Sequence, residues 1–362
     1  MSLVPKHIDN LKPYKAGKPI SEVKRELGLD KIIKLASNEN PYGPSKLALK
    51  SVNDIIESTH RYPDSNGYEL RNKLAKQFNI SIDNVIIGGG SEGIMSVIMR
   101  TFLNDKDEII AAKNSFIGFR VLANASGFKT NWVPMNNYHY DLKLMSKAIN
   151  SKTKVIYLAN PDNPTGTYFD KETFDEFMKN VPTRVIVILD EAYFEYAEHI
   201  EDYPNSMHYR YDNVITLRTF SKAHGLAGFR VGYGFANDIL INNLMKVKLP
   251  FEPSTLGQVS ACAAIDDIEH LKLSIEKNNK EKTKLEEFFK RNDYEYIPSA
   301  TNFITLNLSS SEKAKEICDK MLNKGIILRN LSTFGLDNCI RVSIGTPSEN
   351  KIFMNKFEDL EI

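Results

Sequence analysis

Short apolar segments rich in Ile and Val alternate with amphipathic segments through the middle of the chain. The apolar segments are NVIIG (84–88), DEIIAA (107–112), KVIYLA (154–159), RVIVILD (184–190) and NVITL (213–217). Their length and composition are typical of buried parallel strands, and helix-length segments such as 91–103 and 171–179 lie between them. Repeated strand–helix units of this kind predict an α/β fold of the doubly wound type.

The pattern changes after Pro250. Polar helical sequence continues to about residue 290 and is followed by the short apolar segments NFITLNL, GIILR and CIRVSIG. A helix is predicted near 311–323, and we expect Cys318 to lie on its buried stripe. This change predicts a second, smaller domain.

The chain is accordingly divided into three parts. We expect residues 1–34 to form an N-terminal arm and part of the small domain, residues 35–280 the large domain, and residues 281–362 the small C-terminal domain. The arm is punctuated by Pro5, Pro13 and Pro19, and such arms pack on the body of a protein or on a partner subunit.

Charge and cysteine content narrow the possible partners. The 47 basic and 46 acidic residues give a net charge of +1, so the chain lacks the basic patch expected of a protein that binds nucleic acid or anionic membranes. Its three cysteines have no CxxC spacing, which argues against a disulfide framework or a metal site. No segment resembles a signal peptide or a membrane span, and we expect a soluble cytoplasmic protein that acts on small molecules.

Polar residues follow three of the predicted strands. Asn163 lies in the turn NPDNPTG after one strand, Asp190 ends the next and is followed by Tyr193, and Lys222 comes shortly after the third. Ligands of open α/β sheets bind beyond the carboxyl ends of strands, so these groups are expected to meet. Taken singly, Asp190 could be a helix N-cap and Lys222 a solvated loop residue.

Together, these groups suit pyridoxal phosphate. An amine can form an imine, a carboxylate can keep the ring nitrogen protonated, and amide and phenol donors can bond the ring oxygen. The phosphate needs its own site, and IIGGGSEGIM (86–95) places three glycines between a strand and a helix. The backbone of Gly90, Ser91 and Glu92 could bind it there. Thr219, Ser221 and Arg230 flank Lys222 and could add hydroxyl and guanidinium contacts.

The motifs resemble those of the fold type I pyridoxal-phosphate enzymes, the class II aminotransferases and, among these, the histidinol-phosphate aminotransferases. The matching segments run nearly from end to end and include KLASNENPYGPS (34–45), RYPD (61–64), GGGSEG (88–93), NPDNPTG (160–166), LDEAYFEY (189–196), TFSKAHGLAGFRVGYG (219–234) and IRVSIGT (340–346). The resemblance implies a large domain with a mostly parallel sheet flanked by helices and a smaller α+β domain.

The resemblance also implies roles for individual residues. Lys222 is expected to be the Schiff-base lysine and proton shuttle, Asp190 the partner of the ring nitrogen, and Asn163 and Tyr193 the partners of the ring oxygen. Phe116 would stack on the ring. Phosphate contacts are implied for Ser91, Glu92, Thr219, Ser221 and Arg230. Tyr62 would reach the phosphate across the interface of a homodimer.

Substrate contacts follow from the same resemblance. Arg341 matches the arginine that binds the α-carboxylate of glutamate and 2-oxoglutarate, and a guanidinium fork suits a carboxylate. Tyr14 and Arg329 resemble the pair that receives the substrate phosphate, and Asn40 lies where the arm lines the substrate pocket. The function implied is amino transfer between histidinol phosphate and 2-oxoglutarate in histidine biosynthesis.

Other functions remain open from the sequence. An aromatic or broad-specificity aminotransferase would share most of the motifs, and a decarboxylase or lyase would share the fold. A cofactor-sensing binding protein is a further alternative, although the chain has no basic patch for an effector module that binds DNA.

Overall fold

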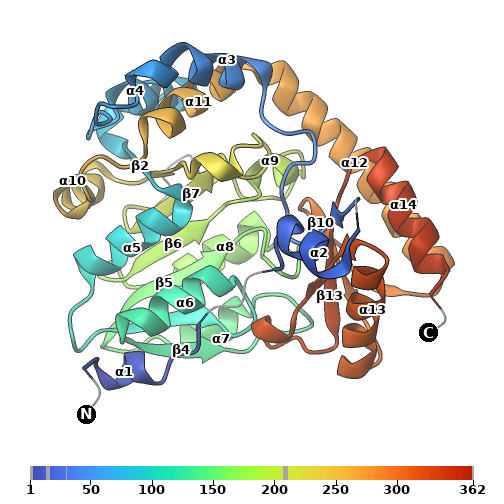
Figure 1. The fold of residues 1–362 in the computed structure, drawn as a ribbon. Helices are drawn as coiled ribbons and strands as arrows, with labels where there is room; N and C mark the ends of the chain where they lie inside the picture. Colours follow the sequence, from blue (N-terminus) through green and yellow to red (C-terminus); the bar gives the residue numbers. More distant parts are fainter. Residues whose placement is uncertain (1–2, 14–16, 30, 207–210, 361–362) are drawn as a thin grey trace.

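A seven-stranded sheet forms the centre of the computed structural model, which describes residues 3–13, 17–29, 31–206 and 211–360 (Figure 1). Its strands are β2 (Val85–Gly88), β3 (Glu108–Ala112), β4 (Lys129–Val133), β5 (Thr153–Ala159), β6 (Ile186–Asp190), β7 (Val214–Thr219) and β8 (Gly232–Phe235). Their order is β2-β8-β7-β6-β5-β3-β4, and only β8 pairs antiparallel with its neighbours. The predicted mostly parallel α/β sheet is confirmed.

Helices cover both faces of this sheet, because alternate residues of each strand point in opposite directions. Ile186 and Ile188 of β6 belong to one core cluster, and Val187 and Leu189 belong to another. The first cluster includes residues of α5 (Gly90–Phe102), α6 (Ile117–Ser126) and α10 (Asp238–Val247). The second includes residues of α7 (Leu142–Lys147) and α8 (Lys171–Met178). The doubly wound arrangement therefore follows from strands that are apolar on both faces.

A third group of helices packs beside β2 and β8. It consists of α3 (Lys46–Ile55), α4 (Tyr68–Phe78) and α11 (Thr255–Asp266), and its core includes Leu70, Leu74 and Ala261. The segment after Pro250 was expected to be helical to about residue 290, and it forms two helices. Helix α11 ends at Asp266, and Asp267 caps the next helix by accepting a hydrogen bond from the backbone N–H of His270.

The C-terminal region has its own antiparallel sheet, with the order β12-β13-β10-β9. The strands are β9 (Glu295–Ile297), β10 (Phe303–Asn307), β12 (Arg329–Asn330) and β13 (Cys339–Ser343), and the helices are α12 (Ile268–Arg291), α13 (Ser311–Asn323) and α14 (Pro347–Glu358). The predicted helix 311–323 coincides with α13. Cys318 is partly buried against the C-terminal core, which confirms the structural interpretation of this cysteine.

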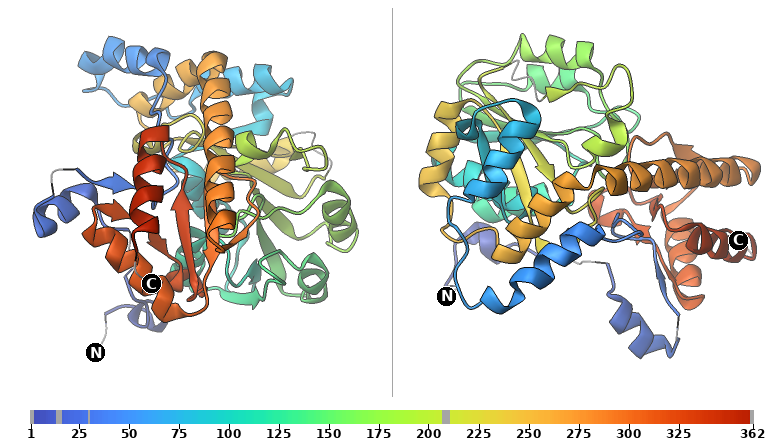
Figure 2. Two further views of the ribbon diagram at one scale, coloured as in Figure 1. Left: turned by 90° about the vertical axis from the view of Figure 1, so that its right-hand side faces the viewer. Right: turned by 90° about the horizontal axis from the view of Figure 1, so that it is seen from above.

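The N-terminal segment contacts both regions. Helix α1 (Lys6–Asp9) lies against α6, and α2 (Ile20–Leu27) buries Val23 against Ile327. Strand β1 (Ile33–Lys34) then pairs in parallel with β11 (Ile326–Ile327). Helix α12, orange in Figure 2, runs without a break across residue 280 from the central body to the C-terminal region. The three predicted domain ranges stay a prediction.

Candidate active site

The ends of β5, β6 and β7 lie side by side, because these strands are neighbours in the sheet. The predicted groups that follow them line one cavity of about 110 Å³. Eleven predicted cofactor residues line it: Gly90, Ser91, Glu92, Phe116, Asn163, Asp190, Tyr193, Thr219, Ser221, Lys222 and Arg230. Ala159, Pro161 and Ala192 complete the lining and were not anticipated. The structure thus brings the predicted amide, carboxylate, phenol and amine together.

A buried ion pair ties the ends of β6 and β7. Arg218 Nη2 lies 2.8 Å from Glu191 Oε2, and both side chains are almost completely buried. Ser206 Oγ donates to the other oxygen of Glu191 at 2.5 Å. Since Glu191 follows Asp190 directly, this network holds the strand end that carries the candidate carboxylate.

Asp190 lies at the floor of the cavity with one oxygen bonded and one not. Tyr157 donates to its Oδ2 at 2.8 Å. Its Oδ1 is buried and has no hydrogen-bond partner of normal geometry among the described residues. Burial raises the pKa of Asp190 to about 7. A buried acceptor without a donor fits a protonated pyridine nitrogen, so the residues present suit pyridoxal phosphate.

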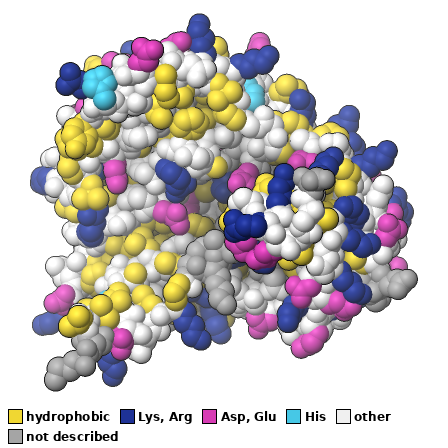
Figure 3. Space-filling model, viewed as in Figure 1, with side chains coloured by type: hydrophobic (Ala, Val, Ile, Leu, Met, Phe, Trp, Pro, Cys, Tyr) yellow, Lys and Arg dark blue, Asp and Glu magenta, His cyan; other side chains and the backbone are white. Residues whose placement is uncertain are grey.

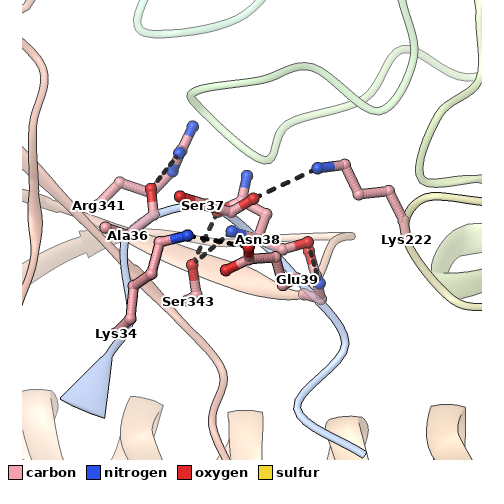
Figure 4. A network of polar contacts seen from close by, with 9 residues as sticks. Lys34, Ala36, Ser37, Asn38, Glu39, Lys222, Arg341 and Ser343 are labelled. Atoms are coloured by element: carbon pink, nitrogen blue, oxygen red, sulfur yellow. Dashed lines mark hydrogen bonds and ion pairs between the residues drawn. The ribbon is translucent and has the colours of Figure 1, made fainter. Parts of the chain in front are cut away.

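Lys222 also lines the cavity. Nζ lies 5.7 Å from the centre of the Tyr193 ring and donates a long hydrogen bond of 3.4 Å to the carbonyl of Ser37 (Figure 4). Burial, together with the nearby Arg341 guanidinium, lowers the pKa of Lys222 to about 8. A pKa near 8 leaves about a tenth of this amine unprotonated at pH 7, far more than in an ordinary lysine, and a nucleophile requires the unprotonated form.

The start of α5 forms the candidate phosphate site. Gly90 is the first residue of the helix and has φ of +80°, and a Cβ there would lie 2.9 Å from Arg230 Nη2. Arg230 Nη1 lies 3.4 Å from Ser221 Oγ, and Nη2 lies 3.4 Å from Glu92 Oε2. Glycine at this position lets the guanidinium approach the helix N-terminus, where backbone N–H groups and a cation can bind a dianion together.

Arg341 connects the C-terminal sheet to the cavity. Its Nη1 donates to Asn163 Oδ1, and its Nη2 donates to the carbonyl of Ala36 at 3.0 Å. Arg329 is its register partner on β12, and both arginines are buried. The Phe334 ring lies 5.7 Å from the Arg329 guanidinium carbon and 5.9 Å from that of Arg341. Two guanidinium groups thus lie close together beside the cavity.

Besides Arg329 and Arg341, two other described residues among those predicted do not line this cavity, Asn40 and Tyr62. The side-chain amide of Asn40 donates to the carbonyl of Ala223 at 2.8 Å, so it braces the loop that carries Lys222. Tyr62 is 81% exposed and stacks on Phe251 with ring centres 4.4 Å apart. Tyr14 lies outside the described residues. The substrate and interface roles of these residues stay predictions.

Sequence reasoning missed several supporting residues. Tyr157 stacks on Phe119 at 3.9 Å and bonds Asp190, although it looked like an ordinary strand residue. Asp162 accepts hydrogen bonds from Ser115 at 2.5 Å and from Thr165 at 2.8 Å next to Asn163. Asn38 contacts Tyr193, and its only sequence signal was its place in SNENP beside the predicted Asn40. The spacing of residues along the sequence does not predict these contacts.

A larger groove of about 940 Å³ runs along α7 and α8. Its charged side chains form ordinary surface pairs such as Lys179–Glu176. It lacks the buried, converging polar groups of the smaller cavity, which is therefore the better candidate. The described part of the chain contains no group of three or more His, Cys, Asp or Glu residues able to hold a metal, and none of its helices is long and apolar enough to cross a membrane.

Residues 30–357 match the family described as aminotransferase class I and II. The chain belongs to this family. This membership confirms the predicted enzyme class, an aminotransferase, and the predicted cofactor, pyridoxal phosphate. The chain is 41% identical over 97% of its length to the histidinol-phosphate aminotransferase of Moorella thermoacetica and covers 91% of that protein. It is 38% identical to histidinol-phosphate aminotransferase 2 of Carboxydothermus hydrogenoformans, with 98% of both chains covered.

Solved structures agree with this membership. The histidinol-phosphate aminotransferase of Sinorhizobium meliloti in complex with pyridoxal-5'-phosphate superposes with a TM-score of 0.91 at 26% identity, covering 99% of this chain and 98% of that one. An aspartate aminotransferase of Thermus thermophilus with maleate has a TM-score of 0.84 at 17% identity, with 99% of each chain covered. This second likeness shows the fold alone.

Proposed function

We propose that this aminotransferase moves the amino group of histidinol phosphate to 2-oxoglutarate, which gives imidazole acetol phosphate and glutamate. The observation that carries the proposal is the pair of buried arginines, Arg329 and Arg341, on adjacent strands beside the cavity. One fork can bind the carboxylate of glutamate and the other the phosphate of histidinol phosphate. The names of the full-length relatives support the same substrate.

The residues around the cavity divide the work. When bound, pyridoxal phosphate supplies an electron-withdrawing ring that acidifies the α-hydrogen of the substrate. Lys222 would remove this proton and return it to the cofactor side, as its lowered pKa permits. Asp190 would hold a proton on the ring nitrogen, and Tyr193 and Asn163 would donate to the ring oxygen. Phe116 would stack on the ring.

The phosphate end would be held by fixed donors. The backbone at Gly90, Ser91 and Glu92, the hydroxyls of Thr219 and Ser221, and the Arg230 guanidinium surround this end of the cavity. In the substrate pocket, Tyr14 would join Arg329 at the substrate phosphate, and Asn40 would line the arm side. An aromatic aminotransferase is less well supported, because an aromatic amino acid offers no phosphate to a buried Arg329.

We also propose a cytoplasmic homodimer in which Tyr62 reaches the cofactor phosphate of the partner subunit. Its 81% exposure beside the exposed Phe251 supports this, since large aromatic side chains are seldom left in water without a partner. Leu47 and Leu49 of α3 are also exposed, and hydrophobic side chains gather over the region of α3 at the top of Figure 3. The same view shows basic and acidic side chains intermixed.

The experiment is to compare Arg329→Gln with Arg341→Gln, using each half-reaction separately. Loss of one charge-assisted contact should lower kcat/KM by about 10²-fold for the ligand group that it binds. Arg329→Gln should impair histidinol phosphate and spare glutamate, whereas Arg341→Gln should impair glutamate most. The substrate assignment would be overturned if Arg329→Gln turned over histidinol phosphate as fast as the wild type and if phenylalanine were an equally good amino donor.

A further inference from the structure

Asn38 lies in the connection between β1 and α3 and is almost completely buried. Its backbone has φ of +56°, in the left-handed region that asparagine tolerates better than most residues. Its side-chain Nδ2 donates to the Tyr193 hydroxyl oxygen at 2.9 Å. A residue of the N-terminal segment therefore contacts the phenol that is proposed to bond the cofactor ring oxygen.

Ser343 at the end of β13 fixes the orientation of the Asn38 amide, and Asn302, just before β10, holds the Asn38 backbone. The Asn38 backbone N–H donates to Ser343 Oγ at 2.9 Å, and the Ser343 hydroxyl donates to Asn38 Oδ1 at 2.9 Å (Figure 4). Asn302 Nδ2 donates to the Asn38 carbonyl at 3.0 Å. Because Ser343 Oγ already accepts the backbone N–H, its hydrogen is directed to Oδ1. The opposite end of the amide, Nδ2, must then face Tyr193.

This contact determines which way the Tyr193 hydrogen points. A phenol has one hydrogen, and an oxygen that accepts from Asn38 keeps that hydrogen for another acceptor. The ring of Tyr193 packs edge-on against Phe303 at 5.4 Å, so the hydroxyl has little freedom to turn elsewhere. Burial raises the pKa of Tyr193 to about 12, which keeps it a donor. Lys222, Arg341, Asp190 and Asp162 are the charged groups that act on it.

We propose that Asn38 is a positioning residue, which orients the Tyr193 hydroxyl toward the ring oxygen of the cofactor and strengthens its donation there. The inference rests on the proposed function of Tyr193 and deepens it. A hydrogen bond accepted by the phenol oxygen polarises its O–H, and donation to the ring oxygen stabilises the deprotonated form of the cofactor–Lys222 linkage. Asn38 therefore lowers the pH at which this linkage loses its proton.

The test is a pH titration of the visible absorption band of the holoenzyme. Asn38→Gly removes the amide, tolerates the positive φ and keeps both backbone hydrogen bonds. We expect the titration midpoint to rise by about 0.5 to 1 pH unit, the worth of one ordinary hydrogen bond. Asn38→Asp should raise it further, because a carboxylate attracts the Tyr193 hydrogen away from the cavity and adds negative charge.

Two comparisons separate positioning from a merely structural role. In a Tyr193→Phe background, Asn38→Gly should leave the midpoint unchanged, because its effect passes through the phenol. Asn350→Ala is the matched structural control. Asn350 is also fully buried and bonds Gly345 and Glu281, outside the cavity lining. It should lower the melting temperature without moving the midpoint.

The outcomes distinguish this inference from the proposed function. An unshifted midpoint in Asn38→Gly, or an equal shift with and without the Tyr193 hydroxyl, would overturn the positioning role while leaving the aminotransferase assignment intact. A wild-type protein mixed with pyridoxal phosphate that develops no lysine-dependent absorption band would instead refute the cofactor role on which the inference rests.

Discussion

We call the residues proposed to hold the cofactor the cofactor side and those proposed to bind the substrate the substrate side, and these two sides are built in different ways. The cofactor side takes its groups from the ends of neighbouring strands in one sheet and from the start of α5. The substrate side takes Arg329 and Arg341 from a separate antiparallel sheet and meets the N-terminal segment at Ala36. The central sheet positions the cofactor side, whereas the substrate side forms only when the N-terminal segment and the C-terminal sheet pack together.

Polar contacts join the two sides at several points, among them those from Thr305 Oγ1 to the carbonyl of Pro164 and from Lys222 Nζ to the carbonyl of Ser37. Arg341 donates to Asn163, and Asn114 donates to the carbonyls of Phe334 and Gly335 at 2.9 and 3.0 Å. Asn114 lies two residues before Phe116, which lines the cavity, and Phe334 lies beside both arginines. We expect changes on the cofactor side to abolish chemistry, and changes at the contacts of Asn114 to alter substrate binding.

The largest effect is expected for Lys222→Ala. Loss of the amine that carries the proton should reduce turnover by at least about 10⁴-fold with either amino donor. Single-turnover measurements with histidinol phosphate and with glutamate check this. The matched control is Lys113→Ala, an exposed lysine next to β3, which should retain normal turnover. Substantial activity in Lys222→Ala would show that another group carries the proton.

An intermediate effect is expected for the stability of the apoprotein after Asp190→Asn. Between pH 3.8 and about 7 the native carboxyl binds a proton that the unfolded chain has released, so stability falls as pH rises through this window. Asparagine does not titrate, so the stability of the variant does not fall in this window for that reason. It should be more stable than the wild type at pH 8 by about 2–4 kcal/mol, with a gain smaller by about 2 kcal/mol at pH 5.

Denaturant unfolding at the two pH values measures this difference. Asp162→Asn is the comparison variant. Burial raises the pKa of Asp162 as well, to about 6, but both of its oxygens accept hydrogen bonds, so the loss of these bonds should offset the gain in stability at pH 8. If the gain in stability from Asp190→Asn is no larger at pH 8 than at pH 5, the account of a buried carboxylate with one unbonded oxygen is contradicted. Catalysis should still decline, because the ring nitrogen loses its anion.

The smallest effect is expected at the contacts of Asn114. Asn114→Ala removes two hydrogen bonds that hold the loop after β12 against the cofactor side, each worth about 1 kcal/mol. We expect KM for histidinol phosphate to rise by about 5- to 30-fold at most, with the affinity for pyridoxal phosphate unchanged. Steady-state kinetics and cofactor titration measure the two quantities. An equal loss of cofactor affinity would show that the two sides are less separate than their construction implies.

The cofactor side was predictable from sequence because its residues lie at fixed offsets from recognisable strands. Asn163, Asp190 and Lys222 follow three apolar segments whose parallel pairing brings their ends together. Strand β8 was missed, since GYGF has too few apolar residues to stand out. Strand β4 was missed because only Val133 of its five residues is fully buried at the sheet edge.

The sequence by itself determined the α/β class, the strand ends that carry the chemistry and the helix start that suits a phosphate, because local periodicity and turn residues encode them. Only the tertiary structure decided that Asn38 contacts Tyr193, that Asn40 braces the Lys222 loop and that Arg329 and Arg341 are neighbours. The first two contacts join residues 155 and 183 positions apart. They depend on how the N-terminal segment and the C-terminal sheet pack, and no local pattern specifies that packing.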